Sequence, residues 1–326
     1  MHIRLFALIL LGAAALAAGA TWAQPPQYPA KAIRLIVPYP AGGPASIVAH
    51  SVGQKLGDAL GQPVIVDNRP GAGANLGTDM VAKAAPDGYT LLLGANGPLV
   101  INVSLYGKLP YDPVRHFAPI TQIAAIPLVL IVHPSVPATS VKELIALAAA
   151  KPGQFNYASS GTGSGGHLSG ALFAAMANVQ MSHVPYKGAA PATADLIGGH
   201  VQMMFDGLLA AIPHIKAGKV RALAVATTRR ATLAPDLPTV AESGLPGFHI
   251  TSWYGLLAPA GTPPAIIDRL HREVVRILQM PEQKERLFVQ GGLEYIGSTP
   301  AEFGATIRKE IPEYARIVKL AGAKAD

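Results

Sequence analysis

Two glycine-rich segments of this sequence have the composition of a loop that binds an anion. The first is PYPAGGPAS, residues 38–46, and the second is SGTGSGG, residues 160–166. Each follows a short apolar run typical of a strand and precedes a helix-like run. Because the first backbone N–H groups of a helix are unpaired and carry the positive end of its dipole, the two segments predict sites for a small anion such as a carboxylate. The alternative for either segment is an ordinary tight turn.

The second segment also contains Gly161-x-Gly163-x-x-Gly166, the glycine spacing of a dinucleotide-binding loop. Such a loop requires an acidic residue about 20 positions further on, which binds the ribose. The region at that distance reads MSHVPYKGAA, residues 181–190, and has neither Asp nor Glu. We therefore expect a cradle for a small anion and no nucleotide or other cofactor.

Enzyme and metal motifs are missing. A serine hydrolase needs Gly-x-Ser-x-Gly, but Thr162 stands two positions before Ser164. The ten histidines form neither His-x-x-x-His nor His-Glu-x-x-His. We expect no catalytic residues and no metal site.

The first 23 residues have the organisation of a secretory signal peptide. A basic start, MHIR, precedes the apolar run LFALILLGAAALAAGA, and Thr21 and Ala23 place small residues before a cleavage point ahead of Gln24. An uncleaved anchor, the alternative, needs about 20 strongly apolar residues. We therefore expect cleavage and a periplasmic protein.

Composition limits the partners and the source of stability. The formal net charge is +7 at pH 7, but the basic residues are scattered, so we expect no nucleic-acid partner. The absence of cysteine means that stability must come from a core rather than from disulfides. Residues 24–326 are long enough for two domains with cores.

The elements that must position the glycine loops alternate between strands and helices. Strands are expected at residues 32–39, 63–68, 89–94, 127–134, 154–160, 201–207 and 220–228, and helices at 44–60, 140–150, 167–177, 264–279 and 300–322. This alternation predicts an α/β fold with mainly parallel sheets wound by helices. If two such lobes face each other, both glycine loops reach one cleft.

Segments along the whole chain after residue 24 resemble the Bug-type receptors, the extracytoplasmic solute-binding proteins of tripartite tricarboxylate transporters. They include IRLIVPYPAGGPASIVAH, VIVDNRPGAGANLGTDMVAKAAPDGYTLLLG, NYASSGTGSGGHLSG, VPYKGAAPATADLIGGHV, RALAVATTRRATLAPDLPTVAESGLPGF and SWYGLLAPAGTP. The resemblance implies a two-lobed periplasmic binding-protein fold with a small organic acid in the interlobe cleft. We assign residues 24–123 and 250–326 to lobe 1 and 124–249 to lobe 2.

The resemblance also implies partners and a set of ligand-binding residues. The partners are a mono- or dicarboxylate and the integral membrane subunits of a secondary transporter, with the receptor itself a monomer. A sensor that uses the same fold without a transport role is the alternative. The expected ligand-binding residues are Tyr39, Ala41, Gly42, Gly43, Ser46 and Asn96 from lobe 1 and Gly161, Thr162, Ser164, Gly165, Gly166 and Asp206 from lobe 2.

The polar members of this set each have a structural alternative. Thr162 and Ser164 could stabilise the turn, Asn96 could cap the next segment, and Asp206 could be a structural hydrogen-bonding group. We expect His167 to bond locally rather than to bind ligand. The sequence departs from the family pattern at Ser46 and His50, where relatives usually carry Asp and Arg. The loss of an acid there favours a plain carboxylic acid over an amino acid as the ligand.

Overall fold

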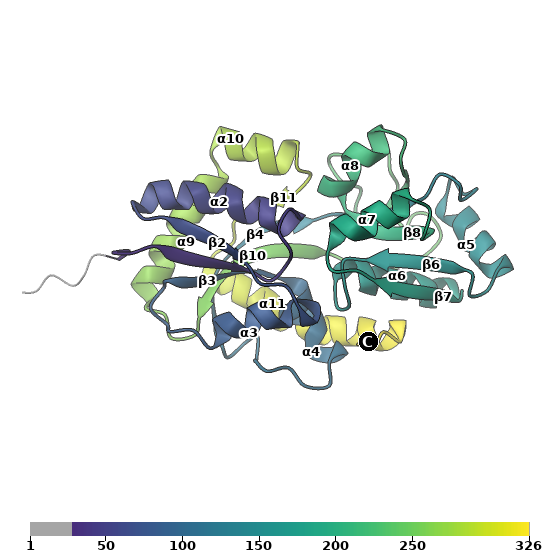
Figure 1. Ribbon diagram of the computed structural model, residues 1–326. Coiled ribbons are helices and arrows are strands. Elements are labelled where there is room, and N and C mark those ends of the chain that lie inside the picture. The colour runs from purple at the N-terminus through teal and green to yellow at the C-terminus, as the bar shows by residue number, and fades with distance from the viewer. Residues whose placement is uncertain (1–27, 326) are drawn as a thin grey trace, which may run out of the picture. The chain divides into compact units, whose positions relative to one another are not determined.

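The computed structural model describes residues 28–325 (Figure 1), so the expected signal peptide at residues 1–23 lies outside the described residues. Residues from Lys31 onward form one compact unit. Among the described helices, none is both long enough and apolar enough to cross a membrane.

The first sheet has six strands in the order β11-β4-β10-β3-β1-β2. Their bounds are β1 Ile33–Val37, β2 Val64–Asn68, β3 Thr90–Ala95, β4 Phe117–Ile126, β10 Ser252–Pro259 and β11 Glu294–Tyr295. The helices α2 (Pro44–Leu60) and α3 (Asn75–Ala82) are the crossovers that allow β1, β2 and β3 to run parallel.

The second sheet has five strands in the order β7-β6-β8-β5-β9. Their bounds are β5 Leu128–Val132, β6 Phe155–Ser159, β7 Met181–Pro185, β8 Met203–Gly207 and β9 Arg221–Val225. Figure 1 shows its helices gathered around it: α5 Val141–Ala150, α6 Gly165–Ala177, α7 Ala189–Ile197 and α8 Leu208–Lys216. Strands β5 and β8 are buried along their whole length, which makes them the centre of this sheet's core.

The remaining elements surround the first sheet. They are η1 Ala72–Ala74, η2 Gly97–Ile101, α4 Asn102–Leu105, α9 Pro264–Leu278, α10 Pro281–Gln283, η3 Lys284–Val289 and α11 Pro300–Ala321. Helix α11 begins with a capping box, in which Thr299 and Glu302 each bond the other's backbone N–H. It packs on β4 of the first sheet and also on α6, which packs on β8 of the second sheet.

The α/β class expected from the sequence is confirmed, but both sheets are mixed where we expected mainly parallel pairing. Strands β10 and β11 pair antiparallel in the first sheet, as does β5 with β8 and β9 in the second. The chain passes between the two sheets at some of these strands. Strand β4 of the first sheet leads into β5 of the second through Pro127 alone, and after β9 the chain returns through residues 226–251 to β10 of the first sheet. A strand that enters a sheet without a crossover helix need not run parallel to its neighbours.

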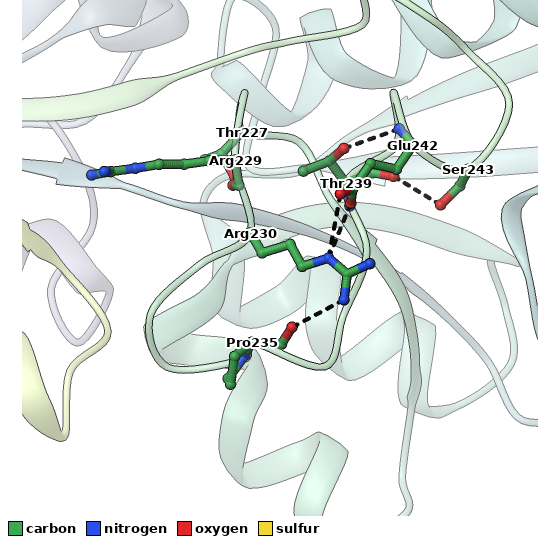
Figure 2. A network of polar contacts seen from close by, with 7 residues as sticks. All are labelled: Thr227, Arg229, Arg230, Pro235, Thr239, Glu242 and Ser243. Carbon is green, nitrogen blue, oxygen red and sulfur yellow. Dashed lines mark hydrogen bonds and ion pairs between the residues drawn. The ribbon is translucent and has the colours of Figure 1, made fainter.

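Polar contacts hold the returning segment, residues 226–251, in place (Figure 2). The carboxylate of Glu242 accepts hydrogen bonds from Arg230 Nε at 3.2 Å and from the backbone N–H of Thr239 at 2.7 Å. Arg230 also donates to the carbonyl oxygen of Pro235 at 3.3 Å. The motif TTRRATLAPDLPTVAESG therefore has a structural role, since it fixes the path that delivers β10 to the first sheet.

Candidate functional site

A cavity of about 160 Å³ is lined by residues that come from both sheets. Its lining comprises Tyr39, Pro40, Ala41, Gly43, Pro44, Ala45, Ala95, Asn96, Gly97, Ile126, Leu128, Ser160, Ser164, Gly165, Gly166, Lys187, Gly188, Ala189, Ala190, Pro191, Phe205, Asp206, Gly207, Ser252, Tyr254 and Leu293. Cavities of about 150 Å³ in other proteins hold a molecule of the size of benzene, so this space suits a small organic molecule rather than a single water.

Four helices begin at this cavity. The residues that precede their first turns all line it: Gly43 before α2, Ser164 before α6, Gly188 before α7 and Gly207 before α8. Each of these helices is the next element in the chain after a strand. Its start therefore lies near the carboxyl end of that strand, at an edge of the sheet.

The first turns of these helices carry no acidic residue, and three of the four have no side-chain cap within the described chain. The exception is α6, where the Ser164 hydroxyl accepts a hydrogen bond from His167 N at 3.2 Å. The positive ends of four helix dipoles therefore act on one small cavity, together with the N–H groups that these starts leave unpaired. At α8 the first N–H, that of Leu208, already donates to the carbonyl oxygen of Pro127 at 2.9 Å. This arrangement stabilises a bound anion without requiring a cationic side chain.

Asn96 lines the cavity but is already bonded to the protein. Its Nδ2 donates to the carbonyl oxygen of Thr251 at 2.9 Å, and the Ser252 hydroxyl donates to its Oδ1 at 2.8 Å. These bonds tie the end of β3 to the start of β10. Asn96 therefore holds the cavity wall in place, whatever contact it makes with a ligand.

Asp206 is a buried carboxyl group at the end of β8, facing the cavity. Its Oδ1 accepts from Gly207 N at 2.8 Å and its Oδ2 lies 3.1 Å from the Thr193 hydroxyl. Burial raises the pKa of Asp206 to about 6, although both hydrogen bonds act in the opposite direction. No lysine or arginine in the described part of the chain forms an ion pair with it.

The structure brings eight of the twelve expected ligand-binding residues to the cavity lining. These are Tyr39, Ala41, Gly43, Asn96, Ser164, Gly165, Gly166 and Asp206. The other four, Gly42, Ser46, Gly161 and Thr162, do not line it. A ligand contact by any of the twelve stays a prediction.

Local geometry explains why those four lie elsewhere. Gly42 is exposed, with the positive φ of 81° that lets the first loop turn, and Ser46 is buried within α2 at 2% exposure. Gly161 donates its N–H to the Ser159 hydroxyl at 3.2 Å. The carbonyl oxygen of Thr162 faces Gly73 of η1, where an added Cβ would approach it to 2.6 Å.

Sequence reasoning missed the α7 and α8 starts and the β10 residues Ser252 and Tyr254. The two helix starts had a signal: YKGAAPA and FDGLL each place a glycine immediately before a helix, at or shortly after the end of a strand. Lys187, an exposed residue at the α7 start, adds a positive charge to a site that we expected to hold only neutral side chains and Asp206. Ser252 and Tyr254 had no such signal, because their place depends on the pairing of β10 with β3.

His167 bonds locally, as expected. Its Nδ1 accepts from Gly163 N at 3.2 Å, and its ring stacks on His183 with 4.0 Å between the ring centres. Within the described residues, no cluster of three or more His, Asp or Glu side chains could hold a metal ion.

Comparison with known proteins gives a consistent match along the chain. A family model described as the tripartite tricarboxylate transporter family receptor matches residues 48–322. Protein BugT of Bordetella pertussis is 40% identical over 298 residues, which cover 91% of each chain.

Two solved structures of proteins with a small acid are similar to this chain. The structure of R. palustris Rpa4515 with adipate has 36% sequence identity and a TM-score of 0.88, covering 92% of this chain and 100% of that one. MatC from Rhodopseudomonas palustris with bound malate has 33% identity and a TM-score of 0.85, covering 89% of this chain and 100% of that one.

Proposed function

This chain belongs to the tripartite tricarboxylate transporter family of receptors, and on that premise we propose that it binds a small organic carboxylate and delivers it to a membrane carrier. The binding site is the cavity at the four helix starts. The membrane subunits of a tripartite transporter are the partners of the closed, liganded receptor. The protein binds its ligand as a monomer.

The single observation that supports this function best is the convergence of α2, α6, α7 and α8 on one cavity. Each helix start provides backbone N–H donors and a partial positive charge, which suit a carboxylate. No arginine of the described chain lines the cavity, and Lys187 at its border is exposed, so neutral donors provide most of the contacts to the anion. Three or four charge-assisted bonds of about 1.5–3 kcal/mol each, less the cost of ordering the ligand, are compatible with the roughly 8 kcal/mol of micromolar affinity.

The ligand class follows from the cavity and from the relatives. A cavity of about 160 Å³ with Pro40, Ile126, Leu128 and Phe205 among its walls suits a compact acid with an apolar body. Adipate and malate, which are present in the solved structures of two similar proteins, are both compact dicarboxylates, adipate with an apolar body and malate with a hydroxyl group. We therefore propose a mono- or dicarboxylate in preference to a tricarboxylate.

The proposed location is the periplasm, after removal of residues 1–23 as a signal peptide. Two lobes, residues 24–123 with 250–326 and residues 124–249, close on the ligand. All strands of the second sheet fall between residues 128 and 225, which supports the assignment of that sheet to the second lobe.

Calorimetric titration tests the binding function. The purified protein is titrated with adipate, malate, C3 to C8 mono- and dicarboxylates, citrate and glutamate, and we expect micromolar affinity for at least one mono- or dicarboxylate. Gly165→Val should weaken this affinity more than about tenfold, because a Cβ at Gly165 points between Leu128 and Ser252 of the cavity wall. Gly107→Val is the matched control, since Gly107 lies outside the cavity lining and its added Cβ meets no atom within 4 Å.

Two outcomes would contradict the proposal. One is that no mono- or dicarboxylate binds. The other is that Gly165→Val binds as tightly as the unmodified protein, which would move the site away from this cavity.

A further inference from the structure

Asp206 places an acidic group inside a cavity that otherwise favours anions. It is 5% exposed and belongs to the cavity lining, where the starts of four helices lie. A ligand carboxylate in a cavity of this size comes close to the Asp206 carboxylate. Two carboxylates that share a site repel each other, and the pair is relieved when one of them takes up a proton.

The hydrogen bonds around Asp206 accommodate that proton. The Thr193 hydroxyl lies 3.1 Å from Asp206 Oδ2 and 3.0 Å from the carbonyl oxygen of Ala189, but it has only one hydrogen to donate. When Asp206 is ionised, the Thr193 hydroxyl donates to Oδ2, and the carbonyl oxygen of Ala189 does not receive this hydrogen. When Oδ2 is protonated, Asp206 donates to Thr193 and Thr193 donates to Ala189, so both contacts are hydrogen bonds.

The other titratable groups of the cavity do not neutralise Asp206. Burial raises the pKa of the Tyr39 and Tyr254 phenols above their usual range, so both remain neutral. Lys187 borders the cavity but is exposed, and water screens its charge.

The elements packed against β8 bring no cation to the carboxylate within the described chain. Strand β5 is aliphatic throughout, and Tyr157 of β6 stacks on His183. His167 of α6 bonds Gly163, and Asp195 of α7 accepts from the Tyr186 hydroxyl at 2.7 Å. The basic residues of α8 lie in its last turn, at the far end from Asp206.

We propose that binding of a carboxylate in this cavity is coupled to the uptake of one proton by Asp206, held between its Oδ2 and the Thr193 hydroxyl. The proton comes from the solvent, and no other bond forms or breaks. The inference rests on the proposed carboxylate-binding function and adds to it a pH dependence of that same site.

The coupling predicts a large change in affinity between pH 6 and pH 8. Burial already raises the pKa of Asp206 in the free protein to about 6, and a nearby ligand carboxylate raises this pKa further. The fraction of the free protein in which Asp206 is protonated then falls from about one half at pH 6 to about one hundredth at pH 8. The affinity should therefore fall about fiftyfold as the pH rises from 6 to 8.

The experiment is titration calorimetry with adipate and malate at pH 7.5 in buffers with different ionisation enthalpies, which counts the protons taken up per ligand bound. We expect about one proton for the unmodified protein. Asp206→Asn, in which an amide replaces the carboxyl group, should take up none, and its affinity should be constant from pH 6 to pH 8. Circular dichroism establishes that this variant is folded.

Glu310→Gln is the matched control, because Glu310 is a second acid whose pKa burial raises, to about 7, and it lies on α11 outside the cavity lining. This variant should retain the proton uptake. Tight binding by the unmodified protein with no proton uptake would overturn the inference and leave the binding function intact. Loss of the uptake in Glu310→Gln but not in Asp206→Asn would also overturn it. If no acid binds, the carboxylate function fails, and the proton coupling fails with it.

Discussion

Replacing Gly166 with alanine should destabilise the protein, because this glycine allows α6 to start directly against β8. A Cβ added at Gly166 would lie 2.6 Å from the carbonyl oxygen of Phe205, which belongs to the strand backbone and cannot rotate away. Either α6 or β8 must move to accommodate the methyl group. The free energy of unfolding should therefore decrease.

The size of the effect follows from two opposing terms. Overpacking at a well-packed site costs about 1–3 kcal/mol. Replacing glycine by alanine within a helix recovers up to about 1 kcal/mol. We expect a net loss of about 1–2 kcal/mol, and at about 2–4 °C per kcal/mol for a protein of this size, a Tm lower by roughly 3–6 °C.

Gly165→Ala provides the matched control, since Gly165 precedes Gly166 in the same helical turn and is also buried. The atoms nearest to its added Cβ would be the flexible end of Leu128, at 3.2 Å, and the side chain of Ser252, at 3.5 Å. This variant should remain within about 0.5 kcal/mol of the unmodified protein. Urea and thermal unfolding without ligand measure both variants. Equal stability of Gly166→Ala and the unmodified protein, or equal losses in the two variants, would refute this account of the α6–β8 contact.

Two further predictions concern the returning segment and α11. Asn96→Ala should lower the free energy of unfolding by about 1–3 kcal/mol, because it leaves the Ser252 hydroxyl without its partner and the carbonyl oxygen of Thr251 with only the hydrogen bond from the Tyr314 hydroxyl; unchanged urea unfolding would contradict this. Burial raises the pKa of Glu310 to about 7, although the hydrogen bond from Trp253 Nε1 acts in the opposite direction. Between about pH 5 and pH 7 the folded state therefore binds a proton that the unfolded state has lost, so the free energy of unfolding should fall as the pH rises from about 5 to 8. In Glu310→Gln the free energy of unfolding, measured with urea at pH 5 and pH 8, should fall less between the two pH values. An identical fall in the variant and the unmodified protein would contradict this assignment to Glu310.

Local sequence signals predicted much of the fold. Helix α2 matches the expected range because a proline at its first position and a glycine after its last residue mark both ends. Strands β4 and β10 were missed, although they pair with each other inside the first sheet and neither is an edge strand. Their sequences contain Pro119 and Gly255, which usually interrupt strands. A Cβ at Gly255 would overlap the ring of Phe303 on α11, so the reason for this glycine lies in tertiary packing.

The candidate site also combines features that are local in the sequence with features that depend on tertiary structure. The two glycine loops were recognised because each is local in sequence, with strand, turn and helix in succession. The burial of Asp206 and the proximity of Tyr254 could not be predicted, since both depend on how distant segments pair. The bond between Asn96 and Thr251, for example, joins residues 155 positions apart.

The late position of β10 in the chain has a consequence for synthesis. Strand β10 pairs with both β3 and β4, so before it emerges the first sheet consists only of β2, β1 and β3, with one side of β3 unpaired. The second sheet needs only residues 128–225, all of which emerge earlier. Because an open strand edge is a template for pairing with other chains, a nascent protein that stops short of Ser252 should aggregate through β3 or require a chaperone to cover it. We therefore expect the second sheet to fold before the first on the growing chain.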